Sequence, residues 1–131
     1  LAQGDNKVQF VGRLSDEDVT AYYAACDIFC FPSVTKNEAF GIALAEGMYF
    51  GKPAVTFNIP GSGVNYVNLD GQTGIECPNG DLRAYADALI SLADNVELRN
   101  LYGRAAKKRV EELFMFETFG KKILDLLELG K

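Results

Sequence analysis

The sequence contains no histidine, and this absence excludes several classes of catalyst. A Ser-His or Cys-His nucleophile pair cannot be assembled from this chain alone, so any acid or base must be Asp, Glu, Lys, Tyr or an outside group. The three cysteines, Cys26, Cys30 and Cys77, are odd in number and lack the histidine companions that are usual in metal sites. We therefore expect buried, reduced thiols, a cytosolic compartment and no bound metal.

Long apolar runs and a positive net charge are missing as well. No run approaches the roughly 18 residues that a membrane-spanning helix needs, and the N-terminal LAQGDNKVQF lacks the pattern of a signal peptide. The net charge is −5, so the broad electrostatic footprint of a nucleic-acid-binding protein is absent. These absences predict a cytoplasmic chain with no transmembrane segment and no nucleic-acid partner.

Short apolar runs alternate with amphipathic segments along the 131 residues. The expected strands cover residues 8–12, 28–31, 53–57 and 73–77. Helices are expected to begin after the capping residues Ser15 and Asp81 and after Asn95 or its neighbour. The apolar side of the helix after Asp81 is expected to carry Leu82, Tyr85, Ala86, Leu89 and Ala93, and a last helix should carry Phe119, Ile123, Leu126 and Leu127. This alternation predicts an α/β fold built on a Rossmann-like, doubly wound parallel sheet.

Two features of this layout indicate a fragment. The chain begins only a few residues before its first expected strand. Four strands are also fewer than the five or six of the common doubly wound sheets. We therefore expect residues 1–131 to form a single domain from which an earlier strand and helix are absent.

Ligands of open parallel sheets bind outside the carboxyl ends of the strands. In this chain these places are the loops after Gly12, Phe31, Phe57 and Cys77. The loop after Phe31 leads into EAFGIALAEG, residues 38–47. A helix that starts near Gly41 would offer the free amides of Phe40, Gly41 and Ile42 to an anion, and a phosphate fits such a site.

Glu38 and Glu46 stand at the two sides of this apolar run. A carboxylate would repel the phosphate but accepts protons from hydroxyl groups, each bond contributing roughly 1.5–3 kcal/mol. A nucleotide sugar carries hydroxyl groups on both sides of its diphosphate, and Glu46 would suit the ribose. Because Glu46 lies in a helix with almost no other polar residue, we expect that helix to be largely buried and the acid to have partners.

Three stretches in order, VQFVGRLSDEDVTAYYAACDIFCFPS, NEAFGIALAEGMYFGKPAV and DGQTGIECPNGD, resemble the paired-glutamate motif and its surroundings in retaining glycosyltransferases of the GT-B fold, especially group 1, also called family 4. The resemblance covers nearly the whole chain. It implies that residues 1–131 are part of the C-terminal, nucleotide-sugar-binding domain, truncated at its N-terminal side and without the N-terminal acceptor domain.

The resemblance also implies a role for each matching position. Glu38 would face the donor sugar as the catalytic residue, and Glu46 would bind the ribose. The amides near Phe40, Gly41 and Ile42 would meet the diphosphate, and Gly12, Arg13 and Leu14 would lie along the base. The family's basic Arg and Lys pair, which neutralises the diphosphate, falls before the first residue of this chain, so the fragment alone is expected to be inactive.

The activity implied is a retaining, metal-independent hexosyl transfer from a nucleotide-diphosphate sugar to a glycan or lipid acceptor, with no cofactor besides the donor. The location implied is cytoplasmic, or peripheral at the membrane through the missing domain. Two alternatives stay open: a non-catalytic nucleotide-sugar-binding module and a GT-B nucleotide-sugar epimerase. The loop that contains Gly61 and Gly63 is a further candidate to approach the sugar, although Asn65 stands where many family members carry an acid.

Overall fold

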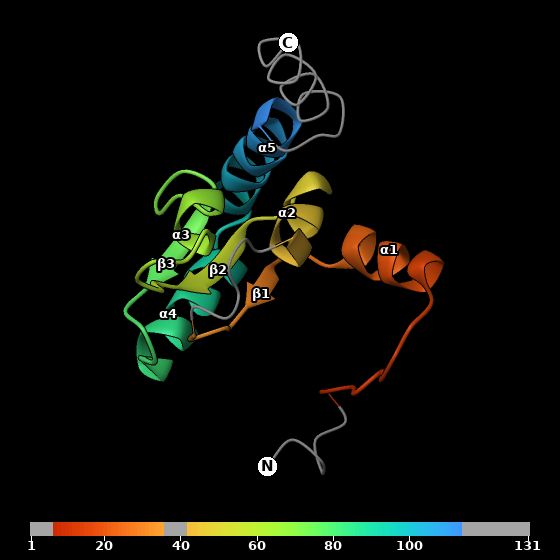
Figure 1. Ribbon diagram of the computed structural model, residues 1–131, viewed down its shortest axis with the longest axis horizontal. Coiled ribbons are helices and arrows are strands. Elements are labelled where there is room, and N and C mark those ends of the chain that lie inside the picture. The colour runs from red at the N-terminus through yellow and green to blue at the C-terminus, as the bar shows by residue number, and fades with distance from the viewer. Residues whose placement is uncertain (1–6, 36–41, 114–131) are drawn as a thin grey trace, which may run out of the picture.

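The structure is a computed structural model that describes residues 7–35 and 42–113 (Figure 1). Its elements, in chain order, are α1 (Asp16–Ala25), β1 (Phe29–Phe31), α2 (Ile42–Tyr49), β2 (Ala54–Phe57), α3 (Val64–Val67), β3 (Gly74–Cys77), α4 (Leu82–Ala93) and α5 (Val96–Leu113). The expected last helix around Phe119 lies outside the described residues. None of the helices described is long and apolar enough to cross a lipid bilayer.

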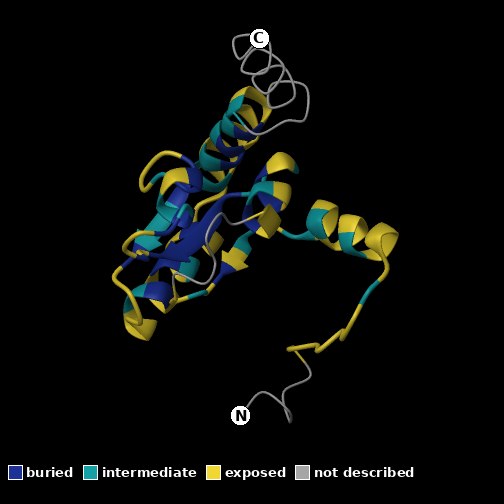
Figure 2. Ribbon diagram, viewed as in Figure 1, coloured by how far each residue is buried: buried dark blue, intermediate teal, exposed yellow. Residues whose placement is uncertain are grey.

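The strands form one parallel sheet in the order β1-β2-β3. Phe31 lies opposite Thr56, and Phe57 lies opposite Cys77. The central strand β2 is buried at every position, as the dark blue ribbon of Figure 2 shows. The predicted strands near residues 28–31, 53–57 and 73–77 are therefore confirmed, together with the parallel α/β class.

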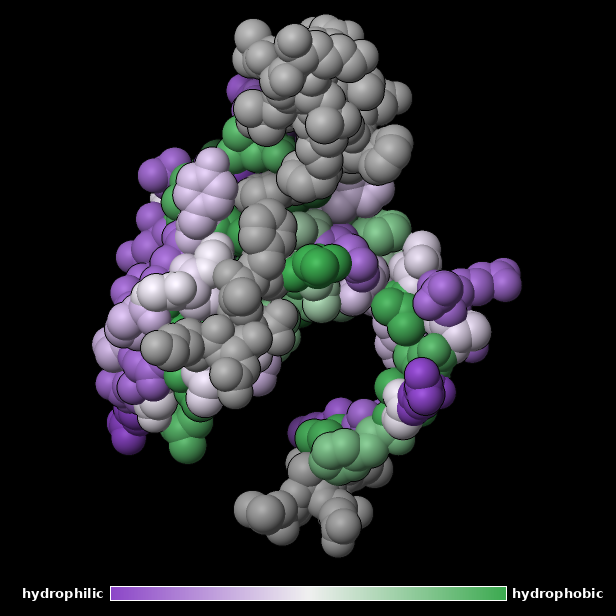
Figure 3. Space-filling view, in the orientation of Figure 1, coloured by the Kyte–Doolittle hydropathy of each residue, from purple (hydrophilic) through white to green (hydrophobic). Residues whose placement is uncertain are grey.

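The first predicted strand is wrong. Residues 8–12 form no strand; the last turn of α1 contacts the body near α2, and the arm of residues 7–15 extends away from it (Figure 1). Figure 3 shows open space between this arm and the body, and Val8, Phe10 and Val11 are 45%, 78% and 42% exposed. A strand needs a neighbouring strand to pair with, and residues 8–12 pair with no strand in the described part of the chain. Its apolar pattern is therefore insufficient to make it a strand here.

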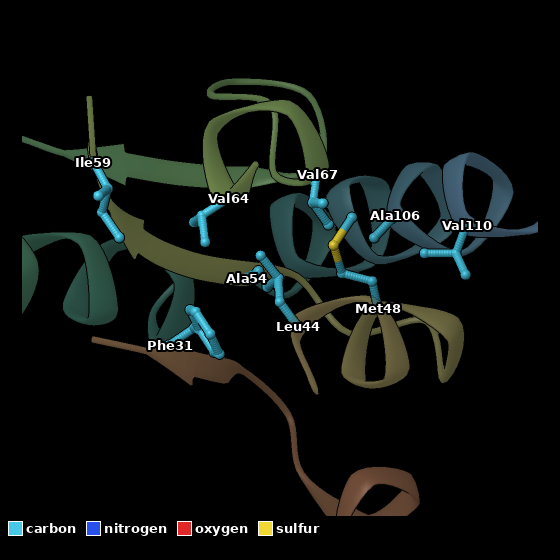
Figure 4. Packing of buried hydrophobic residues seen from close by; sticks show 9 residues of the cluster. All are labelled: Phe31, Leu44, Met48, Ala54, Ile59, Val64, Val67, Ala106 and Val110. Atoms are coloured by element: carbon cyan, nitrogen blue, oxygen red, sulfur yellow. The ribbon is translucent and has the colours of Figure 1, made fainter. Parts of the chain in front are cut away.

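Helices pack on both faces of the sheet, so the sheet is doubly wound. On one face α2, α3 and α5 pack together, as Figure 4 shows for Leu44, Met48, Val67 and Ala106 among others. On the other face α4 packs against β2 and β3, with the core members Val55, Phe57, Cys77, Tyr85, Ala88 and Leu92. Successive residues of β2 thus serve opposite cores, as expected for a strand buried on both sides.

One buried amide ties the strands together on the α3 side. Asn68, directly after α3, is fully buried and donates from Nδ2 to the Thr56 hydroxyl at 2.9 Å. Its Oδ1 accepts from the Thr73 hydroxyl at 2.8 Å. Because both the oxygen and the nitrogen of the amide are hydrogen-bonded, this buried polar group stabilises the fold. It also holds Thr73, the residue before β3, in place.

Two glycines allow backbones and rings to approach closely. Gly47 of α2 is buried with its Cα against the ring of Phe29 in β1. Gly103 of α5 is buried beside the backbone carbonyl of Gly51, in the turn between α2 and β2. These contacts fix α2 between β1 and α5, and α2 carries two of the predicted site residues.

Candidate functional site

The carboxyl ends of the three strands meet at one edge, and a single side chain joins their loops. Asn79, after β3, donates from Nδ2 to the carbonyl of Val34 at 2.9 Å and to that of Asn58 at 2.9 Å. Val34 follows β1 and Asn58 follows β2, so all three strand ends share this amide. Sequence reasoning missed Asn79, whose only signal is its place before Gly80 in a turn.

The loop after β2 is also held by side-chain amides. Asn65 accepts from the Ile59 amide at 3.0 Å and donates to the Ile59 carbonyl at 2.8 Å. Asn58 donates to Oε1 of Glu76 at 2.7 Å, across to β3. Hydrogen bonds from side-chain amides therefore hold the loop that contains Gly61 and Gly63. In Asn65 both the oxygen and the nitrogen of the amide bond to this loop.

Predicted site residues fall at the start of α2. Ile42 is the first residue of this helix and is 65% exposed. Of the elements that the structure describes, α2 is the first after the carboxyl end of β1, in the region where the spacing predicts a helix. Glu38, Phe40 and Gly41 lie outside the described residues, so their placement stays a prediction.

Glu46 lies on the exposed side of α2, and the expectation of a largely buried helix is wrong. Only Leu44, Gly47 and Met48 of α2 are buried, because the helix presents one stripe to the core. The expectation that the acid has a partner is confirmed. The Tyr23 hydroxyl, from α1, donates to Oε2 of Glu46 at 3.2 Å.

Burial, followed by the Glu46 carboxylate, raises the pKa of the Tyr23 hydroxyl above its ordinary value. Tyr23 thus remains a neutral hydrogen-bond donor at physiological pH. No sequence signal distinguished Tyr23 from its neighbour Tyr22, since both sit in the same short helix. Only the folded arrangement brings α1 against the end of α2.

Gly12, Arg13 and Leu14 lie on the arm that extends away from the body (Figure 1). Gly12 has a φ of +66°, which turns the chain there, and Arg13 is exposed. No hydrogen bond or ion pair within the described residues links these three to α2. The structure therefore does not bring the predicted base-binding residues together with Ile42 and Glu46.

The cysteines only partly follow the expectation of buried thiols. Cys77 is buried, Cys26 is half-buried and Cys30 is exposed; all three are free. Burial of the sulfur atoms nevertheless raises the pKa of each thiol above its ordinary value. The protonated, unreactive form is thus favoured. Among residues 7–35 and 42–113 no group of three His, Cys, Asp or Glu could hold a metal ion, and metal independence stays a prediction.

The fold matches that of a solved enzyme structure. Sucrose-phosphate synthase from Thermosynechococcus elongatus superimposes with a TM-score of 0.86 and 25% identity, over 95% of this chain and 30% of that chain. Together with the doubly wound parallel sheet, this likeness defines the class: the fold is that of a GT-B glycosyltransferase.

Sequence comparison places the chain within that class. Residues 2–109 match the family model of glycosyl transferases group 1, and the chain belongs to this family. It is 38% identical to O-antigen chain mannosyltransferase C of Escherichia coli over 96% of this chain. It is 37% identical to D-rhamnosyltransferase WbpZ of Pseudomonas aeruginosa over 86% of this chain. The chain spans only 35% and 29% of the length of these two curated relatives.

Proposed function

We propose that residues 1–131 form the donor-binding half of a retaining glycosyltransferase. The enzyme would transfer a sugar from a nucleotide-diphosphate sugar to a glycan or lipid acceptor, and an N-terminal domain of the same protein would bind that acceptor. One observation carries this proposal. Among the described residues, helix α2 is the first element after the carboxyl end of β1, and it presents Glu46 on its exposed side one turn beyond Ile42.

The geometry suits the two kinds of group in such a donor. The start of α2 carries the positive end of the helix dipole and free amide donors, which favour the diphosphate. Glu46 is exposed and accepts only hydrogen bonds when ionised, which favours hydroxyl groups of the ribose. A ligand with a diphosphate between two polyols therefore matches this end of the helix better than a free phosphate does.

Glu38 would act in the transfer of the sugar itself. Retaining transfer develops positive charge at the anomeric carbon and negative charge on the departing diphosphate. A carboxylate next to the sugar would stabilise the first of these charges, and the amides at the start of α2 would stabilise the second. We propose no metal ion in this step.

The relatives support a choice of donor sugar. Those named above are a mannosyltransferase and a D-rhamnosyltransferase, and D-rhamnose is 6-deoxymannose. We propose that the donor carries a sugar of the manno configuration. Comparing mannosyl, rhamnosyl and glucosyl nucleotide donors would test this choice, and a clear preference for glucosyl donors would overturn it.

Replacing Glu38 by Gln in the complete enzyme tests the catalytic role. We expect the transfer rate to fall by about 100-fold or more while the fold is kept, because the neutral amide no longer offsets the developing charge. Glu97→Gln, at an exposed site near the start of α5, is the matched control and should leave the rate unchanged.

The product distinguishes this function from the two alternatives. Retention of the anomeric configuration, read by NMR of the product, supports the proposal. A product formed without any acceptor would indicate an epimerase. Donor binding without turnover in the complete protein would indicate a non-catalytic module.

A further inference from the structure

Tyr23 is held in place by aromatic contacts that do not depend on its hydroxyl group. Its ring lies edge-on to Phe29 of β1, with ring centroids 5.5 Å apart, and 5.9 Å from Phe50 at the end of α2. Lys52 adds a separate anchor for α1, donating from Nζ to the Ala24 carbonyl at 2.9 Å. The tyrosine ring therefore has a fixed position relative to α2, whether or not the hydroxyl makes a hydrogen bond.

Glu46, in contrast, has few constraints. Its side chain is exposed on α2, and the Tyr23 hydroxyl is its one hydrogen-bond partner in the described part of the chain. A free glutamate samples several rotamers, and binding a ligand through it requires that this freedom be lost. The Tyr23 hydroxyl already holds Oε2 and restricts the side chain before the ligand binds. Less conformational freedom of Glu46 is therefore lost on binding.

The bond to Tyr23 also leaves room for a ligand. A carboxylate offers about four lone-pair positions on its two oxygens, and the tyrosine occupies one of them, on Oε2. Oε1 remains available to accept protons from neighbouring hydroxyl groups. The arrangement is a preoriented acceptor rather than a closed pair.

We propose that Tyr23 is a positioning residue that orients the carboxylate of Glu46 toward the ribose hydroxyl groups of the nucleotide. This inference rests on the proposed function, because it assumes that Glu46 meets the ribose. It goes further by assigning the selection of ribose to a pair of residues from α1 and α2. Tyr23 would not itself touch the ligand.

The test compares two neighbouring tyrosines. Tyr23→Phe removes only the hydroxyl and keeps the ring contacts with Phe29 and Phe50. Tyr22→Phe is the matched control, since Tyr22 is in the same helix and half of its surface is exposed. The complete enzyme and these variants of it are titrated calorimetrically with ADP, GDP, UDP and CDP, up to millimolar concentration. The 2′,3′-dideoxy form of the tightest ligand is then titrated in the same way.

We expect wild type to prefer the ribose form to the dideoxy form. Tyr23→Phe should weaken binding of the ribose form by about 3- to 10-fold and leave binding of the dideoxy form unchanged, because only ribose hydroxyl groups use the oriented carboxylate. Tyr22→Phe should match wild type. Glu46→Gln should lower the ribose preference at least as much, and Tyr23→Phe should add nothing in that background.

Each contrary outcome has a separate meaning. If Glu46→Gln lowers the ribose preference and Tyr23→Phe does not, Tyr23 has no positioning role and the donor site stands. If neither variant changes the preference, Glu46 does not read ribose, and the inference fails with it. If wild type binds none of the four diphosphates, the proposed donor site of this chain is itself contradicted.

Discussion

Replacing Gly47 by Ala tests the close contact that fixes α2 on β1. An added Cβ at this position would lie 2.5 to 2.8 Å from three ring atoms of Phe29, closer than such atoms approach in proteins. The ring has little room to move away, because its centroid is already 5.5 Å from that of Tyr23. We expect the substitution to displace α2 or the ring, and to disturb the Tyr23–Glu46 pair with it.

Two opposing effects set the change in the free energy of unfolding of Gly47→Ala. Ala is favoured over Gly inside a helix by about 1 kcal/mol. Overpacking a well-filled core costs about 1–3 kcal/mol, and the tyrosine behind the Phe29 ring favours the upper half of that range. The free energy of unfolding should therefore fall by about 1–2 kcal/mol despite the better helix former.

Urea unfolding followed by circular dichroism measures this change. Asn100→Ala, at an exposed site of α5, reports helix propensity without overpacking and should be neutral or stabilising. In a Phe29→Ala background the ring is gone, so Gly47→Ala should become stabilising. A Gly47→Ala variant that is more stable than wild type in the presence of Phe29 would refute the reasoning, since it would show that α2 does not rest on this ring.

Three further substitutions test the packing and the polar core. Gly103→Ala should lower the free energy of unfolding by about 1–3 kcal/mol in a urea titration, because the new Cβ meets the backbone carbonyl of Gly51, which cannot rotate aside; an unchanged midpoint would contradict the contact. Asn68→Ala should lower it by about 2–4 kcal/mol in thermal unfolding, because two buried threonine hydroxyls lose their partner; a loss below 1 kcal/mol would mean that the amide is not buried as described. Tyr85→Phe should lower it by about 1–3 kcal/mol at neutral pH, because the buried carbonyl of Val55 loses a donor at 2.9 Å. Burial raises the pKa of the Tyr85 hydroxyl above the ordinary value of about 10, so its stabilising effect is complete below that pH and is lost as the pH rises further. Wild type should therefore lose more stability than Tyr85→Phe between pH 9 and 11, and parallel profiles would exclude this role of Tyr85.

Local chemistry in the sequence was enough to predict three strands and the helix caps. Short continuous apolar runs bounded by turn residues suit strands that are buried on both faces, which is how β2 is used. The caps depend on the nearest few residues alone. Ser15 accepts from the Asp18 amide at 3.2 Å, Asp81 accepts from that of Ala84 at 2.9 Å, and Asn95 accepts from that of Leu98 at 3.0 Å, each as predicted.

Features that depend on distant partners could not be read in this way. The arm of residues 8–12 has a strand-like pattern, but pairing requires a neighbour that sequence spacing does not supply. The apolar face of α4 was predicted only in part. Tyr85 is buried and Leu89 packs against the core as expected, but Leu82 is 76% exposed, and the buried Ala88 and Leu92 were not predicted. Apolar residues occur on several sides of that helix, so periodicity alone could not choose the face that meets the sheet.

In the candidate site, too, the features set by nearby residues were predicted and those set by distant partners were not. The presence of a helix over Ile42 to Glu46 followed from the turn residues before it and the apolar residues within it. The exposure of Glu46 did not, because it depends on which side of α2 the sheet occupies. Its partner Tyr23 is 23 positions away in the chain, and only the packing of α1 on the end of α2 brings the two together.

The most direct test of the donor site is an amide NMR titration of the complete enzyme with the nucleoside diphosphate that it binds best. We predict that the largest shift changes occur at the start of α2, at Ile42 and Ala43, and at Glu46. The start of α4 is an internal control, because the side chain of Asp81 already caps it. Shift changes that gather at α4, or none at millimolar ligand, would contradict the donor site proposed for α2.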